Sequence, residues 1–424
     1  MFRSIRGHSH TIRAYGIPVR EIDRYLHMGI LVRRIEKTSR FMAGHFRLRP
    51  VARRRNVAFG NCPTLLTDWI FQAIPPRVHL WQGNPLYREL KTDWPIGWVL
   101  EDEDGKIVGS MGNIPLLFEL NGRRILAASG RHWVAETAHR SSSILLLDRL
   151  ITQPQIDLYV NTTVSSVSVP PVTALGCSRM QVGIWDEVAY WITNYPGCFK
   201  SLVARRNPFA FPLWEGSWTH LKAMGALLSK LPSHQFSKAF SRSSGTALRD
   251  FDVEVIACSD FDERFDKFWE DLKRINPHML LAVRSREVLR WHFKYAVLGS
   301  RVWIATIVDG SRLIAYAIFS TTCNAETGIK QVKLVDYQAL DGSPAMLGPF
   351  MSWALKRCRS EGIHILEHTG RWLEKGEPFE NAAPYRRKLP SWQYFYRINN
   401  PALRAALSDK NVWGPSLLDG DATL

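Results

Sequence analysis

The stretch Asp104-Gly105-Lys106-Ile107-Val108-Gly109 predicts a β-hairpin. Glycine accepts a positive φ without steric cost, so an Asp-Gly pair between two strand-like runs is a strong hairpin signal. The strand before the turn is expected at residues 97–101 and the strand after it at 106–111. An antiparallel pair therefore opens a sheet at this point of the chain.

The sequence after this hairpin predicts a sheet that is interrupted by a helix. A longer strand is expected at 125–136, a helix at 141–150 and a further strand at 156–162. Strands that alternate with helices favour a mixed α/β sheet covered by helices.

The same order recurs in the second half, around the turn Asp309-Gly310. The expected elements are strands at 301–307 and 312–319, a central strand at 331–339, a helix at 345–358 and a strand at 363–368. The matching order and spacing indicate an internal duplication, with two unrelated α/β domains as the alternative. The predicted fold class is thus α/β, with two domains in tandem, each a mixed twisted sheet flanked by helices.

Composition divides the chain into four segments. We expect a basic extension at 1–55, a first domain at 56–202, a linker at 203–249 and a second domain at 250–424. The linker is rich in Ser, Pro and aromatic residues. The last part of the second domain, Trp413 to Asp421, has the composition of a loose, turn-rich tail without a chemical role.

The net charge of +16 is concentrated at the N-terminus. Residues 1–55 hold fourteen Arg or Lys against three Asp or Glu, which accounts for +11. This distribution and the lack of zinc-finger spacing make a nucleic-acid partner unlikely. Residues 22–30 approximate a basic amphipathic helix, which favours contact with an anionic membrane surface or an acidic protein. A solvated arm and a mitochondrial presequence are the alternatives.

Cysteine usage and hydropathy indicate a cytoplasmic protein that is at most peripheral to the membrane. The six cysteines are far apart and form no C-x-x-C pair, so we expect neither a metal site nor a disulfide framework. No apolar run approaches the roughly 18 to 20 residues that a spanning helix needs.

Three stretches of the first copy resemble the GNAT superfamily of acyl-CoA N-acyltransferases: Asp104–Gly109, Trp133–Glu136 and Arg140–Leu145. In that family a loop of small residues presents bare amide groups to the pyrophosphate of coenzyme A. The resemblance assigns this part to Arg140, Ser141, Ser142 and Ser143. Ser143 and Leu145 stand where the family has small residues, usually glycine.

The second copy resembles the same superfamily more loosely. Gly342 and Ser343 stand at its phosphate loop, and Tyr385 stands where such enzymes hold a tyrosine that protonates the departing thiolate. Together the copies resemble tandem GNAT proteins among bacterial enzymes of polysaccharide and peptidoglycan aminoacyl transfer.

The resemblance implies transfer of an acyl group from a thioester to an amine or hydroxyl. The donor is acyl-CoA, such as acetyl-CoA, or an acidic acyl carrier protein; the acceptor is a small molecule or sugar; no cofactor is permanently bound. Such chemistry needs a general base, for which Glu136, Asp336, Glu367 and His368 are candidates near strand ends. A helix cap for Glu136 and a core histidine for His368 are the structural alternatives. Transfer from aminoacyl-tRNA and a non-catalytic binding protein remain as other functions.

Overall fold

The computed structural model describes residues 47–51, 79–81, 83–90, 94–203, 253–374, 385–389 and 393–423. Its contacts group the chain into two compact units. The first comprises 1–116, 126–179 and 393–403, and the second comprises 117–125, 180–392 and 404–424. Residues 22–30 and 204–249, which include the predicted amphipathic helix and nearly all of the predicted linker, lie outside the described residues.

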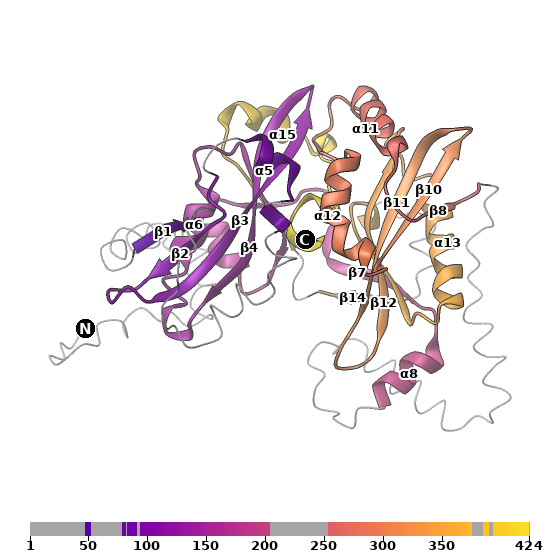
Figure 1. Ribbon diagram of the computed structural model, residues 1–424, viewed down its shortest axis with the longest axis horizontal. Helices are drawn as coiled ribbons and strands as arrows, with labels where there is room; N and C mark the ends of the chain where they lie inside the picture. Colours follow the sequence, from indigo (N-terminus) through magenta and orange to yellow (C-terminus); the bar gives the residue numbers. More distant parts are fainter. Residues whose placement is uncertain are drawn as a thin grey trace. The chain divides into compact units, whose positions relative to one another are not determined.

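The first unit is a mixed sheet with helices against it (Figure 1). Its strands, in spatial order, are β1 (Arg47–Val51), β2 (Gly97–Glu101), β3 (Ile107–Leu120), β4 (Arg123–Ala135), β5 (Leu158–Val164), β15 (Gln393–Ile398) and β6 (Ser178–Arg179). Its helices are α5 (Pro85–Glu89), η2 (Thr137–His139), α6 (Ile144–Ile151) and α7 (Val169–Ala174). Leucines of α6 pack onto the sheet beside Trp98 and Tyr159 and so form the core.

The second unit repeats this plan. Its strands, in spatial order, are β14 (Tyr385–Lys388), β7 (Ile184–Ile192), β13 (Ile365–Gly370), β12 (Lys330–Ala339), β11 (Arg312–Cys323), β10 (Val302–Asp309) and β8 (Ile256–Cys258). Its other elements are α8 (Tyr195–Val203), α11 (Glu263–Ile275), β9 (Leu281–Ala282), α12 (Arg286–Leu298), α13 (Leu347–Ser360) and η3 (Arg371–Glu374). Helix α13 covers one face of the sheet, and α11 and α12 lie on the other (Figure 1).

The predicted fold class is confirmed: both units are mixed α/β sheets flanked by helices. Both hairpins form at the expected turns, where Gly105 has a φ of +78° and Gly310 a φ of +58°. In each unit one strand pair is parallel, β4 with β5 and β12 with β13, and the other described strand pairs are antiparallel. None of the helices in the described ranges is both long and apolar enough to cross a membrane.

The order of β7 and β15 along the chain does not follow the predicted segments. Strand β15 follows the second unit's β14 in sequence but pairs with β5 and β6 of the first sheet. Strand β7 precedes the predicted linker but pairs with β13 and β14 of the second sheet. Residues 47–51, assigned to the basic extension, form β1 and pair with β2. The boundaries of the four segments otherwise stay a prediction.

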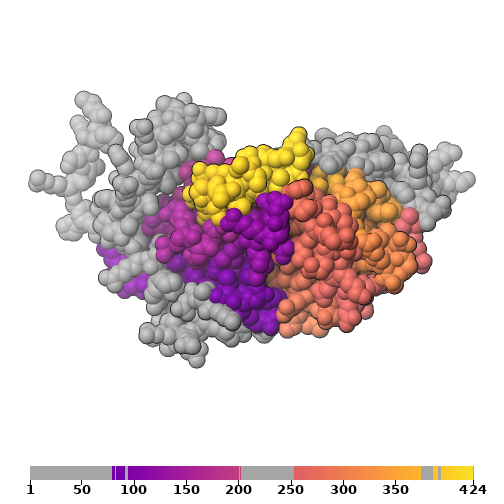
Figure 2. All heavy atoms as spheres, turned by 90° about the horizontal axis from the view of Figure 1, so that it is seen from above, coloured from indigo at the N-terminus to yellow at the C-terminus, as the bar shows by residue number. Residues whose placement is uncertain are grey.

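The expectation of a loose tail at Trp413 to Asp421 is wrong. This segment is buried, with Trp413 and Leu417 each 2% exposed. The short helical turns η6 (Leu417–Asp419) and η7 (Asp421–Thr423) lie in or at the end of this segment, and η4 (Pro401–Leu403), α15 (Arg404–Leu407) and η5 (Lys410–Val412) precede it. Figure 2 shows the outer side of the C-terminal region in yellow at the surface. The turn-forming residues here therefore belong to a segment whose apolar side chains pack inward.

One buried guanidinium joins this segment to the second sheet. Arg284, 1% exposed, donates to both carboxylate oxygens of Asp336 (2.9 and 3.0 Å), to Asp419 (2.8 Å) and to the Ser416 hydroxyl (3.0 Å). Asp336 also accepts from the Tyr316 hydroxyl at 2.9 Å. A charge this deep is tolerated only because carboxylates neutralise it and its donors find acceptors.

Removing this guanidinium should strongly destabilise the second unit. Arg284→Met leaves two carboxylates buried without their cation, so we expect a loss of about 3–5 kcal/mol in the free energy of unfolding, measured by urea denaturation. Arg290→Met is the matched control, because Arg290 pairs with Asp260 at 2.6 Å but both side chains are about half exposed. It should cost less than about 1 kcal/mol. Equal losses in the two variants would contradict the assigned importance of Arg284.

Candidate active site

The parallel strands β12 and β13 pair over a short length and then part. Their register contains three pairs: Gln331 with Ile365, Val332 with Leu366, and Lys333 with Glu367. Strand β12 continues to Ala339 and β13 to Gly370 without further pairing to each other. Beyond Lys333 and Glu367, backbone groups on the facing edges of the two strands therefore have no ladder partner across the gap.

A buried ion cluster marks the point of parting. Glu367, 1% exposed, accepts from Arg387 of β14 at 2.5 Å, and its other carboxylate oxygen lies 3.7 Å from Lys333 Nζ. Burial acts to raise the pKa of Glu367, but Lys333 and Arg387 outweigh it, so the pKa is lowered. The cluster holds the last register pair together and fixes where the gap begins.

A β-bulge lies directly after that point, at Val335 of β12. Phe319 of β11 is opposite Leu334 and Ile318 is opposite Asp336, so Val335 has no partner in the β11–β12 ladder. Leu334 and Tyr337 consequently both face the core under α13. Asp336 is turned to the opposite face, where Arg284 meets it. Bulges re-aim side chains in this way and release a backbone N–H from the ladder.

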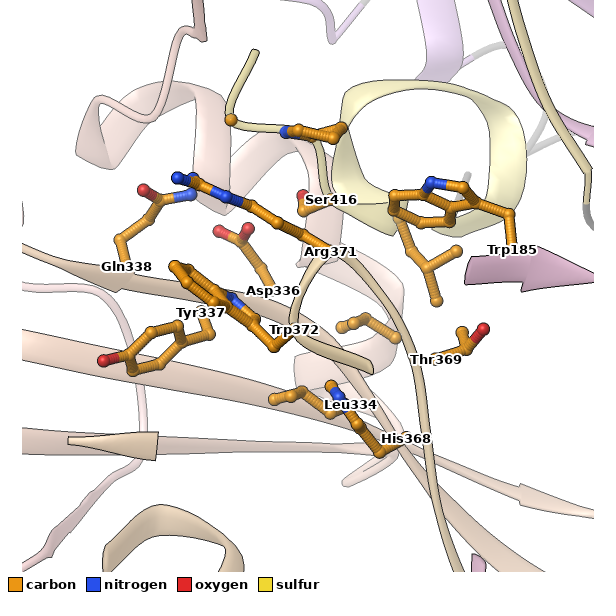
Figure 3. A pocket seen from close by; sticks show the side chains of 14 residues that line it. Trp185, Leu334, Asp336, Tyr337, Gln338, His368, Thr369, Arg371, Trp372 and Ser416 are labelled. Carbon is orange, nitrogen blue, oxygen red and sulfur yellow. The ribbon is translucent and has the colours of Figure 1, made fainter. Parts of the chain in front are cut away.

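A pocket occupies the parting of β12 and β13 (Figure 3). Its lining comes from β12, the end of β13, η3, β7 and the C-terminal segment, namely residues 334–338, 368–369, 371–372, Trp185 and 414–417. The cavity volume is about 20 Å³, which is room for about one water molecule. The lining combines aromatic and aliphatic side chains with polar ones, among them Gln338, His368 and Arg371.

Two basic side chains line the pocket in different charge states. His368 is 1% exposed, and burial, with the nearby charge of Arg386, lowers its pKa to about 3. Its imidazole is therefore neutral at pH 7. Burial also lowers the pKa of Arg371 to about 10, against the field of Asp419, so this guanidinium stays charged. Arg371 stacks on Trp372 with 4.4 Å between guanidinium carbon and ring centroid.

Of the predicted catalytic residues, the structure brings Asp336 and His368 to this one pocket. The oxygens of Asp336 are occupied by Arg284 and Tyr316, and those of Glu367 by Lys333 and Arg387. Both carboxylates thus serve as ion-pair partners in this arrangement, and His368 is the predicted base that remains as a candidate in the pocket.

In the predicted phosphate loop, the backbone amides of Gly342 and Ser343 donate to acceptors within the same turn. The Gly342 amide donates to Ala339 O at 2.9 Å, and Gly342 has a φ of +65°. The Asp341 carboxylate accepts from the Ser343 amide at 3.0 Å and from its hydroxyl at 2.7 Å. A carboxylate of the chain itself already takes the place of an anion here.

The residues predicted in the first unit lie in a similarly closed turn. The amides of Ser142 and Ser143 donate to His139 O at 3.0 and 3.1 Å, and the Ser143 hydroxyl donates to Arg140 O at 2.7 Å. Glu136 forms a partly exposed ion pair with Lys106 at 2.8 Å. The structure does not bring Glu136 or Arg140–Ser143 to the pocket of the second unit.

Tyr385 also lies outside the pocket. It is the first residue of β14, where its ring stacks on Tyr190 with centroids 5.4 Å apart. Its hydroxyl lies 3.0 Å from that of Tyr195. The proposed role of Tyr385 as an acid is therefore a prediction without support from its position.

Sequence reasoning missed Arg371, Trp185 and the segment at 414–417. Arg371 had one usable signal, since it follows the parallel strand β13 directly and ligands bind at the carboxyl ends of such strands. Across the described ranges, no group of three or more His, Cys, Asp or Glu side chains has a metal-binding arrangement.

No family model and no curated protein matches this sequence. Solved structures with a similar outline include a GCN5-related N-acetyltransferase from Anabaena variabilis, with 12% identity, coverage of 84% of this chain and 73% of that one, and a TM-score of 0.47. An N-myristoyltransferase from Saccharomyces cerevisiae with bound myristoyl-CoA has 11% identity, coverage of 83% and 82%, and a TM-score of 0.46. A probable N-acyltransferase from Enterococcus faecalis has 11% identity, coverage of 84% and 72%, and a TM-score of 0.47. Similarities of this size carry no argument about what this chain binds or does.

The buried His368 should make stability pH-dependent. Its pKa is about 3 in the folded protein and ordinarily 6.5. Between these two pH values the unfolded chain binds a proton that the folded protein does not, so the free energy of unfolding decreases as the pH is lowered. From pH 7 to pH 5 the wild type should lose about 2 kcal/mol more than His368→Gln, measured by urea denaturation. The exposed His278 provides the control, since His278→Gln should keep the wild-type pH dependence. A wild type and His368→Gln with the same pH profile would contradict this.

Proposed function

We propose that the second unit is an acyltransferase and that its active site is the pocket where β12 and β13 part. The observation that carries this proposal is the parting itself, which begins at Lys333 and Glu367 and is lined on both sides by strand backbone. An extended donor arm that contains amides, such as the pantetheine of coenzyme A, fits such a gap because it pairs with both strand edges as a strand would.

The bulge supplies the chemistry that thioester attack requires. The carbonyl oxygen gains negative charge as the nucleophile adds, and a fixed backbone N–H near that oxygen stabilises the charge. Val335 lines the pocket and has no partner in the β11–β12 ladder. We assign its N–H as an oxyanion donor.

His368 is the candidate for orienting the acceptor's nucleophile. It lines the same pocket and is neutral at pH 7, so a ring nitrogen can accept a hydrogen bond. Its low pKa makes it a weak base, suited to positioning the nucleophile rather than to removing its proton. Glu136 as a base and Tyr385 as an acid are the other candidates that the sequence offers.

The donor, acceptor and location are finer parts of the proposal. Acyl-CoA is the preferred donor and an acidic acyl carrier protein the second, since residues 1–55 are strongly basic and would speed the encounter. A sugar or small-molecule acceptor, a part in polysaccharide biosynthesis, and cytoplasmic placement with contact to an anionic membrane surface remain predictions from the sequence.

The first test is binding of acetyl-CoA and octanoyl-CoA by calorimetry, with the full chain and with residues 1–46 removed. The deletion stops there because residues 47–51 form β1. Binding that survives the deletion supports coenzyme A as the donor. Binding by neither form would overturn that donor and favour a carrier protein, aminoacyl-tRNA or a protein without catalysis.

The role of the bulge is tested by Val335→Pro, which removes the N–H of a residue that has no register partner on β11. We expect acyl-CoA turnover, followed by release of free thiol, to fall by about 10²–10³. Val335→Ala is the matched control, since it keeps the N–H and should stay near the wild-type rate. A Val335→Pro variant that folds, binds acetyl-CoA and turns over normally would rule out this donor.

A further inference from the structure

The pocket holds a cation whose donors meet no acceptor in the described part of the chain. Arg371 makes no ion pair and donates no hydrogen bond to any residue that the structure describes, and its Nε is buried without a partner among them. A guanidinium has five N–H donors in a planar fork, and a buried donor without a partner is costly. Arg371 as a whole is half-buried, so an anion from outside the chain can reach its guanidinium and satisfy these donors.

The carboxylates nearest to Arg371 are already committed. Asp336 and Asp419 both accept from Arg284, and Asp419 also accepts from the Ser416 amide at 2.7 Å. Figure 3 shows Arg371 extending across the pocket above Trp372, with its guanidinium toward Gln338. The charge thus points into the space between β12 and the C-terminal segment and away from the aliphatic floor at Leu334.

Gln338 provides a second polar group beside the guanidinium. It lies on β12, is 8% exposed and lines the pocket. Its side-chain amide makes no hydrogen bond with the described part of the chain, although its backbone is in the β11–β12 ladder. A carboxamide N–H and a guanidinium together match the two oxygens of one ligand group.

A glycine lets the C-terminal segment approach Arg371 closely. A Cβ at position 414 would lie 3.1 Å from Arg371 Nη1 and 2.7 Å from Met279 Cε. Any other residue would therefore press on the guanidinium or on the wall behind it.

We infer that Arg371 and Gln338 bind the carboxylate of the acceptor, so that the acceptor is an amine or alcohol that carries a carboxylate, as an amino acid does. This inference rests on the proposed acyl transfer at the pocket and specifies its substrate class. Aromatic walls from Trp185, Tyr337 and Trp372 then contact the apolar body of that acceptor.

The inference is tested with the full chain and three probes: N-acetylglycine, its neutral isostere N-acetylglycinamide, and inorganic phosphate. Binding of the two N-acetyl compounds is measured by saturation-transfer difference NMR, and binding of phosphate, which has no carbon-bound proton to observe, by the loss of the N-acetylglycine signal when phosphate is added. We expect N-acetylglycine to bind, and its amide to bind at least about tenfold more weakly because it loses the charge-assisted hydrogen bonds. Phosphate should also bind more weakly, because it lacks the body that the aromatic walls contact. Equal signals from N-acetylglycine and its amide, or no signal from either, would overturn the inference without any variant.

Variants locate the carboxylate. Arg371→Gln should weaken N-acetylglycine binding by about tenfold or more, Arg371→Lys less, and Gln338→Met by a few-fold. Arg357→Gln is the matched control, because Arg357 also stacks on tryptophans, 4.4 Å from the Trp303 ring centroid, but lies on α13 outside the pocket. Unchanged binding in Arg371→Gln would overturn the assignment.

Acetyl-CoA binding by the same variants separates this inference from the proposed function. Arg371→Gln should keep wild-type affinity for acetyl-CoA, since its partner is the acceptor. Two results would instead place a phosphate of the donor at Arg371: loss of acetyl-CoA binding in Arg371→Gln, or displacement of acetyl-CoA by inorganic phosphate in the wild type but not in that variant. Either result would overturn the inference that Arg371 binds the carboxylate of the acceptor. N-acetylglycine binding without any acetyl-CoA binding by the wild type would refute the coenzyme A donor while the carboxylate site stands.

Discussion

The buried charge of Arg284 is the constraint on which the second unit depends. A guanidinium that is 1% exposed must meet carboxylates inside the protein or the unit loses several kcal/mol. Asp336 reaches it because the bulge at Val335 turns that side chain away from the apolar face under α13. Asp419 reaches it from the C-terminal segment. One electrostatic requirement therefore fixes both the bulge in the central strand and the position of the segment that closes the pocket.

The same sheet uses a second ion cluster to open the site. Lys333, Glu367 and Arg387 hold the last register pair of β12 and β13, and beyond that pair the strands separate. Strands that stayed paired would satisfy their backbone groups but leave no room for a ligand. Beyond Lys333 and Glu367, β12 and β13 therefore form no ladder hydrogen bonds with each other, and buried charged side chains lie near this gap. The same few residues thus contribute to stability and border the candidate site.

Backbone, rather than the predicted anion loops, provides the candidate chemistry. The turns at Arg140–Ser143 and at Gly342–Ser343 both use their amides internally, the second with the carboxylate of Asp341. Such loops offer few bare donors to a pyrophosphate. The pocket instead combines an N–H released by the bulge, a neutral histidine and one charged arginine. These groups suit stabilising an oxyanion and orienting an acceptor.

Local sequence determined the hairpins at Gly105 and Gly310, the long central strands, α13 and the α/β class, because turn propensity and side-chain periodicity act over a few residues. It also placed Asp336 and His368 near strand ends. Only the tertiary structure decided that β7 pairs in the second sheet and β15 in the first, that the segment after Trp413 is buried, and that Arg371 enters the pocket. Arg284 meets partners 52 and 135 residues away. Pairings over such distances depend on which edges and charges remain unsatisfied once the chain has folded, and no local pattern encodes that.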